Sequence, residues 1–283
     1  MEWFTSAAGI RMPKLIYGTA WKKSATERLV ATAIARGFRG IDTACQPKHY
    51  DEPGVGAGVA ASLGDNLTRA DLYLQTKFTP LSGQDPKRIP YDSQAALPQQ
   101  VVQSVEVSLH NLRTDYIDCL VLHSPLPSAK QTHEVWAAME AFVDGGKVGQ
   151  LGISNCYQVL QLEALYDGAR IKPAVVQNRF YADTRYDLNI RAYCRRRHII
   201  YQSFWTLTAN PNALLSPAIT ALAAKYQRTA PQILFRYLTQ IDAAPLTGTS
   251  SEQHMREDLA IFEFQLTTPE ISSLNTLFMN EAG

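Results

Sequence analysis

Three ionisable residues stand at the ends of three successive apolar, strand-like runs of the chain: Asp42, Lys77 and His123. A tyrosine, Tyr50, follows the first of them in the stretch IDTACQPKHYDE. Charges are seldom buried unless they are paired, and Asp42 beside Lys77 would supply such a pair. If the fold brings these four residues together, they can act as one proton-donating group.

Tyr50 is the residue that we expect to donate the proton. An unperturbed phenol has a pKa near about 10, too high for efficient acid–base catalysis at neutral pH. We expect the Lys77 ammonium to lower that pKa and the Asp42 carboxylate to hold the lysine charged and in place. A neutral His123 can orient a carbonyl oxygen. Such a group protonates an oxygen on which negative charge develops, as the reduction of a carbonyl requires.

Eight short apolar runs rich in β-branched residues alternate with segments of helical periodicity. The strand-like runs are 14–20, 40–44, 72–78, 116–124, 148–155, 173–180, 199–205 and 243–249. The helix-like segments are 24–37, 97–112, 132–146, 157–169, 188–197, 216–227, 251–262 and 269–278. Strands separated by helices run parallel, because each crossover returns the chain to the same end of the sheet.

Eight such units in 283 residues predict an α/β fold, a (β/α)8 TIM barrel forming a single domain over residues 1–283. The alternative is an open doubly wound sheet, which is weakened because no GxGxxG motif follows the first strand. We expect an N-terminal hairpin to close the bottom of the barrel and an extra C-terminal helix, 269–278, to pack outside it. Active sites of such barrels lie at the C-terminal ends of the strands, where the ionisable residues stand.

The composition argues against several classes of partner. Lys and Arg number 27 and Asp and Glu 26, so the formal net charge of +1 calls for neither nucleic acid nor an anionic membrane. No apolar run approaches the roughly 18 to 20 residues that span a bilayer, and the N-terminus lacks the features of a signal peptide. Four widely spaced cysteines without a CxxC pair suit reduced thiols. We therefore expect a cytoplasmic protein.

Seven short segments give the chain a resemblance to the aldo-keto reductase superfamily along nearly its whole length. They are GFRGIDTA (37–44), EPGVG (52–56), LQTKF (74–78), DYIDCLVLHSP (115–125), LGISN (151–155), VVQN (175–178) and GTSSEQHMRED (248–258). Each segment is a weak indication by itself. Together their order and spacing agree with eight successive strands.

The resemblance implies that NADPH binds extended across the barrel mouth and passes a hydride to an aldehyde or ketone, while a tyrosine donates the proton. Asp42, Lys77 and His123 occupy the supporting catalytic positions. The implied contacts of the nicotinamide are Ser154, Asn155 and Gln177 with its carboxamide and Phe204 with its ring face. The other implied cofactor-binding positions are Gly18, Thr19, Asp42, Gly248, Thr249, Ser250, His254, Glu257 and Asp258.

The chain departs from the family pattern near the tyrosine. The family usually has its tyrosine five positions after the aspartate, which is Pro47 here. Two extra residues separate Asp42 from Glu52, so that counting back from Glu52 places His49 in the usual slot and Tyr50 beside it. We favour Tyr50 over His49 as the acid, because histidine already titrates near about 6.5 and gains little from a neighbouring lysine. A third possibility is that neither residue reaches the pocket.

A second departure lies at the expected phosphate site. Many family members have a Lys-Ser pair and a later arginine there, whereas this chain has Gly248, Thr249 and His254. Arg256 lies about 200° around the helix from the face of residue 254, so it points away. The helix N-terminus at 250–253 still favours a phosphate. We therefore expect NADPH, with NADH as the alternative.

The expected substrate is a small-molecule carbonyl compound, in a pocket formed by Trp21, His49, Ser124 and Trp205. The tryptophan that often follows the family histidine is replaced by Ser124, so that wall of the pocket is expected to be more open. A different hypothesis is a cofactor-binding regulatory or redox-sensing protein with little turnover. A metal-dependent hydrolase is disfavoured, because the strand ends offer no cluster of metal ligands.

Overall fold

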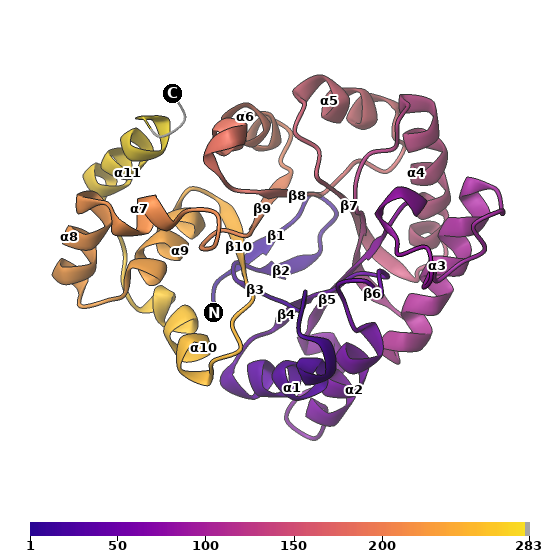
Figure 1. Ribbon diagram of the computed structural model, residues 1–283, viewed down its shortest axis with the longest axis horizontal. Coiled ribbons are helices and arrows are strands. Elements are labelled where there is room, and N and C mark those ends of the chain that lie inside the picture. Colours follow the sequence, from indigo (N-terminus) through magenta and orange to yellow (C-terminus); the bar gives the residue numbers. More distant parts are fainter. Residues whose placement is uncertain (281–283) are drawn as a thin grey trace.

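A closed barrel of eight strands forms the centre of the computed structural model, which describes residues 1–280 (Figure 1). The strands follow one another in the order β10-β3-β4-β5-β6-β7-β8-β9, and all eight neighbouring pairs are parallel. Their bounds are β3 Ile16–Gly18, β4 Gly40–Asp42, β5 Tyr73–Phe78, β6 Ile117–Leu122, β7 Val148–Ser154, β8 Val175–Arg179, β9 Ile200–Phe204 and β10 Ala243–Thr247. Each lies inside a run that the sequence predicts as a strand, so the TIM-barrel prediction is confirmed and the open sheet is excluded.

Helices surround the barrel on its outside (Figure 1). They are α1 Thr26–Arg36, α2 Glu52–Ser62, α3 Leu97–Leu112, α4 Ala129–Asp144, α5 Val159–Gly168, α6 Leu188–Arg196, α7 Pro211–Leu215, α8 Pro217–Tyr226, α9 Ala230–Gln240, α10 Glu252–Leu259 and α11 Thr268–Asn280. The sequence predicts most of them, but α2, α7 and α9 are absent from the predicted set. Helices α2 and α9 complete crossovers between neighbouring strands, and α7 is a single short turn before α8.

The glycines of α2 explain why its sequence does not indicate a helix. Three glycines in EPGVGAGVAAS lower its helix propensity. In the structure, a Cβ atom on Gly56 would collide with the Asn111 carbonyl oxygen, and one on Gly58 would collide with that of Glu27. The glycines therefore allow α2 to pack closely between α1 and α3. This packing stabilises a helix that propensity alone disfavours.

Helix α9 has a helical pattern in its sequence, although it is missing from the predicted set. Its polar residues Gln232, Arg236, Thr239 and Gln240 recur at helical spacing, and eight of its residues are buried. Its start is also encoded locally, because Thr229 and Gln232 form a reciprocal capping box. The helix returns the chain from β9 to β10 and so closes the barrel.

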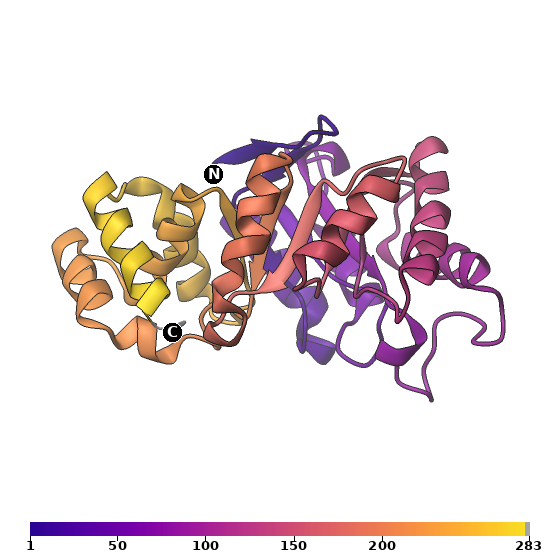
Figure 2. The ribbon, with the colours of Figure 1, turned by 90° about the horizontal axis from the view of Figure 1, so that it is seen from above.

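The two ends of the described chain cover the barrel as expected. Strands β1 (Trp3–Thr5) and β2 (Arg11–Pro13) form an antiparallel hairpin at the end of the barrel opposite the mouth (Figure 2). Met12 from this hairpin is fully buried among the side chains inside the barrel. At the other terminus, α11 packs outside, where the Phe278 ring lies 5.2 Å from the Tyr237 ring of α9. The predictions of a bottom hairpin and an outer helix are confirmed.

Candidate active site

A buried ion pair stands where β4 and β5 reach the barrel mouth. The Lys77 Nζ donates hydrogen bonds to Asp42 Oδ1 at 2.7 Å, to Asp42 Oδ2 at 2.6 Å and to the Thr43 carbonyl oxygen at 2.8 Å. Lys77 is 1% exposed and Asp42 is 2% exposed. Burial lowers the pKa of Lys77, and the Asp42 carboxylate opposes that effect. The pairing expected from the sequence is therefore present, and it uses all three N–H donors of the lysine.

The segment 43–51, which we call the arm, leads from β4 to α2 and carries the two extra residues. It is tied to the neighbouring strand by a hydrogen bond from Cys45 N to the Lys77 carbonyl oxygen at 3.1 Å. The backbone N–H groups of His49 and Tyr50 both donate to the Gln46 carbonyl oxygen, each at 3.1 Å. This tight turn takes up the extra length. The arm consequently returns to the barrel mouth at Tyr50.

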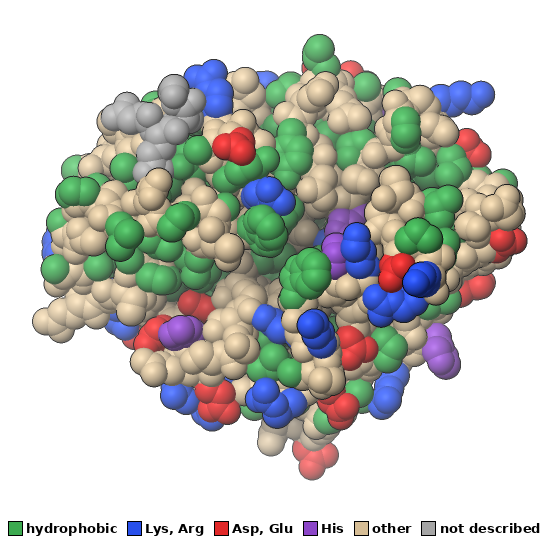
Figure 3. Space-filling model, viewed as in Figure 1, with side chains coloured by type: hydrophobic (Ala, Val, Ile, Leu, Met, Phe, Trp, Pro, Cys, Tyr) green, Lys and Arg blue, Asp and Glu red, His purple; other side chains and the backbone are tan. Residues whose placement is uncertain are grey.

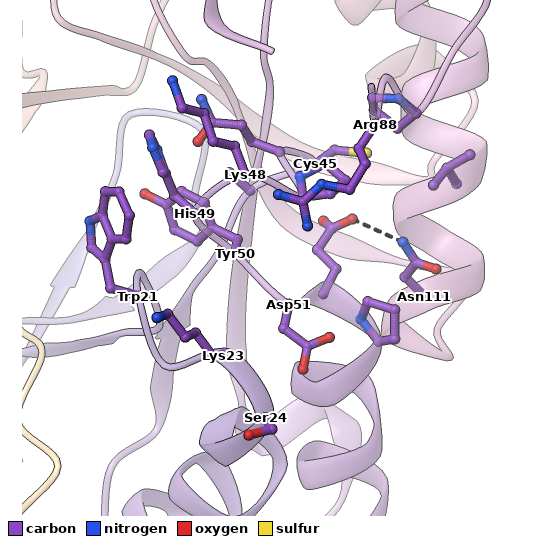
Figure 4. Close-up of a pocket in the computed structure, with 17 residues that line it drawn as sticks. Trp21, Lys23, Ser24, Cys45, Lys48, His49, Tyr50, Asp51, Arg88 and Asn111 are labelled. Carbon is purple, nitrogen blue, oxygen red and sulfur yellow. Dashed lines mark hydrogen bonds between the residues drawn. The ribbon is translucent and has the colours of Figure 1, made fainter. Parts of the chain in front are cut away.

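Tyr50 lies within the catalytic cluster, and His49 lies beside Trp21. The Lys77 Nζ is 5.2 Å from the Tyr50 ring centroid, and the His123 ring is 6.0 Å from the same ring. The His49 ring is 4.0 Å from Trp21 (Figure 4). The structure thus brings Tyr50, Lys77, His123 and Asp42 together, while His49 borders the same mouth.

The pKa of Tyr50 differs from the sequence-based expectation. Burial, with a further contribution from the Asp42 charge, raises the pKa of Tyr50 above that of an ordinary phenol. The expected net lowering of this pKa is therefore wrong, because burial and the Asp42 carboxylate outweigh the effect of the Lys77 charge, which is paired with Asp42. Tyr50 therefore holds its proton firmly until a basic oxygen approaches.

His123 follows β6 and is expected to be neutral. Burial, together with the positive charge of Lys77, lowers the pKa of His123 well below its ordinary value. Its Nδ1 lies 2.6 Å from the Thr79 hydroxyl oxygen, which fixes the ring. At neutral pH the imidazole is uncharged, in agreement with the prediction.

The three expected carboxamide contacts stand together at the ends of β7 and β8. The Ser154 hydroxyl donates to the Gln177 carbonyl oxygen at 2.6 Å. Asn155 Nδ2 donates to the His123 carbonyl oxygen at 2.8 Å. Gln177 Nε2 donates to Asp42 Oδ1 at 3.0 Å. Gln177 is therefore bonded to the Asp42 carboxylate, Asn155 to the backbone of His123, and Ser154 to the backbone of Gln177.

The remaining residues expected at the mouth vary in exposure. Trp21 is 57% exposed and Trp205 is 48% exposed, while Phe204 and Ser124 are half-buried. Thr19 is fully buried, and both its N–H, at 3.0 Å, and its hydroxyl, at 2.9 Å, donate to the Asp42 carbonyl oxygen. Thr19 thus supports the end of β4, next to the half-buried Gly18 at the end of β3.

The expected phosphate end, where α10 begins, is much more open. Gly248, Ser250 and His254 are exposed. The cap of α10 is Ser251, whose hydroxyl accepts from His254 N at 3.4 Å, so the helix begins one residue later than expected. Thr249 is half-buried and its hydroxyl accepts from Ser251 N at 3.1 Å.

The acids expected at the adenosine end differ from each other. Asp258 is buried and accepts a 2.7 Å hydrogen bond from the Thr247 hydroxyl, and burial raises its pKa to about 6. Glu257 lies nearer the surface, where its Oε1 accepts from Gln253 Nε2 at 2.8 Å. Arg256 lies 3.7 Å from Glu252, on the outer face of the helix as expected. Contacts of Glu257 and Asp258 with a cofactor stay predictions.

Two cations at the mouth were missed by the sequence reasoning. Lys22 Nζ donates to the carbonyl oxygen of Gly248, and so brings a positive charge to the end where the family lysine is missing. The Arg179 guanidinium lies 4.1 Å from the Trp205 ring centroid and 5.0 Å from that of Tyr181. Lys22 directly follows Trp21 in the sequence, and Arg179 lies two residues after Gln177, so both are close in the sequence to expected contacts.

The mouth is hollowed at the centre of the face seen in Figure 3, where hydrophobic side chains border the hollow. A cavity of about 530 Å³ lies between the arm, the start of α2 and α3. Residues that line it include Trp21, His49, Tyr50, Arg88 and Asn111 (Figure 4). Asp42, Lys77 and His123 are not among the lining residues.

The described part of the chain has neither a cluster of metal ligands nor a helix suited to a membrane. Among residues 1–280, no group of three or more His, Cys, Asp or Glu side chains is arranged to hold a metal ion. Within the same residues, no helix combines the length and the apolar character needed to cross a membrane.

Comparison with known proteins gives consistent results. The sequence model of the Aldo/keto reductase family matches residues 14–278. Glyoxal reductase of Bacillus subtilis is 28% identical, with 96% of this chain and 91% of the relative covered. Human aldo-keto reductase family 1 member C2 is also 28% identical, with 95% and 89% covered. Among solved structures, the aldo-keto reductase MGS-M4 from a Medee basin deep-sea metagenome library has a TM-score of 0.84 at 22% identity, with 100% and 96% covered. The likeness to MGS-M4 supports the fold.

Proposed function

The chain belongs to the aldo/keto reductase family, and we propose that it is an NADPH-dependent reductase that converts an aldehyde or ketone of a small-molecule metabolite to an alcohol. NADH is the alternative cofactor. The observation that carries the proposal is the buried Asp42–Lys77 pair with Tyr50 and His123 around it. The proposal includes a cytoplasmic location, which is supported by four buried free cysteines.

The side chains around the mouth fit a nicotinamide cofactor. Such a cofactor, when bound, supplies a hydride to the carbonyl carbon. Ser154, Asn155 and Gln177 offer several hydrogen-bonding atoms within one cluster, as a carboxamide requires. Phe204 offers an aromatic face beside them. At the other end, Lys22 at Gly248 supplies a positive charge suited to a phosphate.

The source of the proton follows from the position of Tyr50 beside Lys77 and His123. Its hydroxyl donates a proton to the carbonyl oxygen as negative charge develops there, and a phenolate remains. Lys77, 5.2 Å from the ring centroid, stabilises that phenolate, and Asp42 keeps Lys77 charged. Neutral His123 orients the carbonyl oxygen. This division of roles explains why a buried ion pair stands next to a phenol with a raised pKa.

The alternative, a regulatory or redox-sensing protein, receives less support. A sensor thiol needs an accessible thiolate, but burial raises the pKa of Cys119 and of Cys156, each to about 12. Burial also raises the pKa of Cys45 and Cys194. A protein that only binds a nucleotide does not require a phenol beside a buried Asp42–Lys77 pair.

Turnover with a panel of aldehydes tests the proposal. The panel includes glyoxal, which the name of one relative suggests. Oxidation of NADPH or NADH is followed by absorbance, and binding of each cofactor is measured separately by fluorescence. We expect binding together with consumption for at least one aldehyde. Binding without consumption across the panel would favour the regulatory alternative, and no binding would contradict both.

A further inference from the structure

A network of buried side-chain amides lies directly beneath the catalytic carboxylate, inside the barrel. Gln75 of β5 and Gln202 of β9 are fully buried, and Gln177 of β8 is 3% exposed. The network continues to Met12 of the bottom hairpin. Three amides packed in a barrel core are costly unless every group is hydrogen-bonded. Their bonding pattern therefore reveals what fixes each amide.

Two of the amides bridge the same pair of acceptors. Gln75 Nε2 donates to Asp42 Oδ1 at 2.6 Å and to Gln202 Oε1 at 2.8 Å. Gln177 Nε2 donates to Asp42 Oδ1 at 3.0 Å and to Gln202 Oε1 at 2.8 Å. An amide nitrogen carries two hydrogens, so both are used in each case.

The direction of the bonds in this network is dictated by charge. An ionised carboxylate only accepts hydrogen bonds, so Gln75 and Gln177 must turn their nitrogens toward Asp42. Gln202 then turns its oxygen toward both, and its Nε2 donates to Gln75 Oε1 at 2.9 Å and to Met12 Sδ at 3.1 Å. Reversing any one amide would place oxygen against oxygen.

Gln177 is consequently left with one type of bonding atom. Its nitrogen is committed to Asp42 and Gln202, and its Oε1 alone stays available to a ligand at the mouth. The oxygen can accept a hydrogen bond but cannot donate one. A ligand that meets Gln177 must therefore bring an N–H or O–H.

We propose that Gln202 is a positioning residue that holds Gln177 as an acceptor-only contact and so selects the N–H side of the nicotinamide carboxamide. This inference rests on the proposed function, because it concerns the cofactor of the same site. Gln202 does not contact the cofactor. It accepts the second N–H of Gln177, so that only the Gln177 oxygen faces the carboxamide and fixes its orientation. The orientation of the carboxamide in turn sets the ring face presented to the substrate.

The test uses NADP⁺ and its 3-acetylpyridine analogue, in which a methyl group replaces the carboxamide NH₂. Dissociation constants of both are measured by fluorescence quenching for the wild type, Gln202→Met, Gln177→Met and the double variant. The matched control is Gln150→Met, because Gln150 is 1% exposed in the same core and its Nε2 donates to the Tyr73 hydroxyl, which donates to Gln75, so that Gln150 bonds neither Gln177 nor Gln202.

The wild type is expected to bind the analogue about fivefold to tenfold more weakly than NADP⁺, the effect of one lost hydrogen bond. In Gln202→Met this ratio falls to less than about twofold, because Gln177 can then keep one N–H on Asp42 and present its freed second N–H to the mouth. The double variant shows no further fall, which reveals coupling between the two glutamines. Gln150→Met keeps the wild-type ratio.

The wild type alone provides a second measurement that does not depend on the folding of a variant. The thionicotinamide analogue keeps the NH₂ group but weakens the acceptor, so an acceptor-only Gln177 predicts near-normal affinity for it. Weak binding of the thio analogue with normal binding of the acetyl analogue would overturn the proposal. So would an unchanged ratio in Gln202→Met. A wild type that binds neither nucleotide would instead contradict the proposed function itself.

Discussion

The catalytic end and the phosphate end of the barrel mouth are built in opposite ways. At the catalytic end, Asp42 and Lys77 are buried and meet each other with short hydrogen bonds. At the phosphate end, Gly248 and His254 are exposed, and the nearby positive charge comes from Lys22 in a loop. Under the proposed function, we therefore expect the chemistry to depend on groups fixed by the core and the cofactor preference to depend on exposed residues.

The largest expected effect comes from breaking the buried pair. Lys77→Met leaves the Asp42 carboxylate buried without its cation, so we expect a loss of about 3 to 5 kcal/mol in the free energy of unfolding. Turnover should fall by about 10² to 10⁴. Denaturant unfolding and steady-state kinetics measure the two effects.

The control for Lys77→Met is the double variant Asp42→Asn/Lys77→Met, which removes both charges. It should recover much of the free energy of unfolding, because no unpaired charge stays buried. It should recover none of the turnover, because the reaction needs the Lys77 charge beside Tyr50. If Lys77→Met alone were as stable and as active as the wild type, the catalytic end would not depend on the ion pair.

The phosphate end should respond more mildly. Lys22→Met removes the charge beside Gly248, so the affinity for NADPH should fall about tenfold and the affinity for NADH by less than about threefold. Fluorescence titration of both cofactors measures this. The control is Lys23→Met, at the adjacent exposed lysine, which should change neither affinity. Equal losses for both cofactors in Lys22→Met would show that Lys22 does not face the 2′-phosphate.

The smallest expected effect is that of pH on the reduction step. The raised pKa of Tyr50 keeps the phenol protonated as the pH rises, and the lowered pKa of His123 keeps the imidazole neutral as the pH falls. The single-turnover rate of reduction should therefore stay level from about pH 6 to about pH 9. A decline as the pH rises, with an apparent pKa below about 6.5, would indicate that His49 supplies the proton, because burial lowers the pKa of His49.

The stability of the fold has its own pH dependence from His123. Because its pKa is lower in the folded state than in the unfolded chain, the unfolded chain binds more protons below about pH 6.5. This residue's contribution to stability is therefore complete at neutral pH and is lost progressively as the pH falls. In His123→Asn, the free energy of unfolding, measured by denaturant titration, should fall less steeply as the pH drops below about 6.5.

The sequence predicts the barrel well because strand runs and their order are local, repeated features. All eight strands and the ion pair at β4 and β5 follow from them. Helix α2 escapes prediction because tertiary packing around Gly56 determines it, and α7 because it is only five residues long. The polar pattern and the capping box of α9 are sequence features that could have revealed it. The raised pKa of Tyr50 escapes prediction because burial and the position of the Asp42 charge are properties of the folded site.

The contacts that the sequence could not give are those between residues distant in the chain. Lys22 meets Gly248 across the closing strands of the barrel, and Gln202 joins Gln75 to Gln177 inside it. No spacing rule predicts such pairs. The choice between Tyr50 and His49 likewise depends on the turn at Gln46, which returns the arm to the barrel.

The proton donor is the central claim, and single-turnover reduction by Tyr50→Phe and His49→Gln tests it most directly. Both variants are first shown to bind NADPH with wild-type affinity, and an aldehyde reduced by the wild type is then added. We predict that Tyr50→Phe slows reduction by about 10² to 10⁴, whereas His49→Gln changes it by less than about threefold. The opposite ranking, with Tyr50→Phe active and His49→Gln inactive, would contradict the assignment of Tyr50.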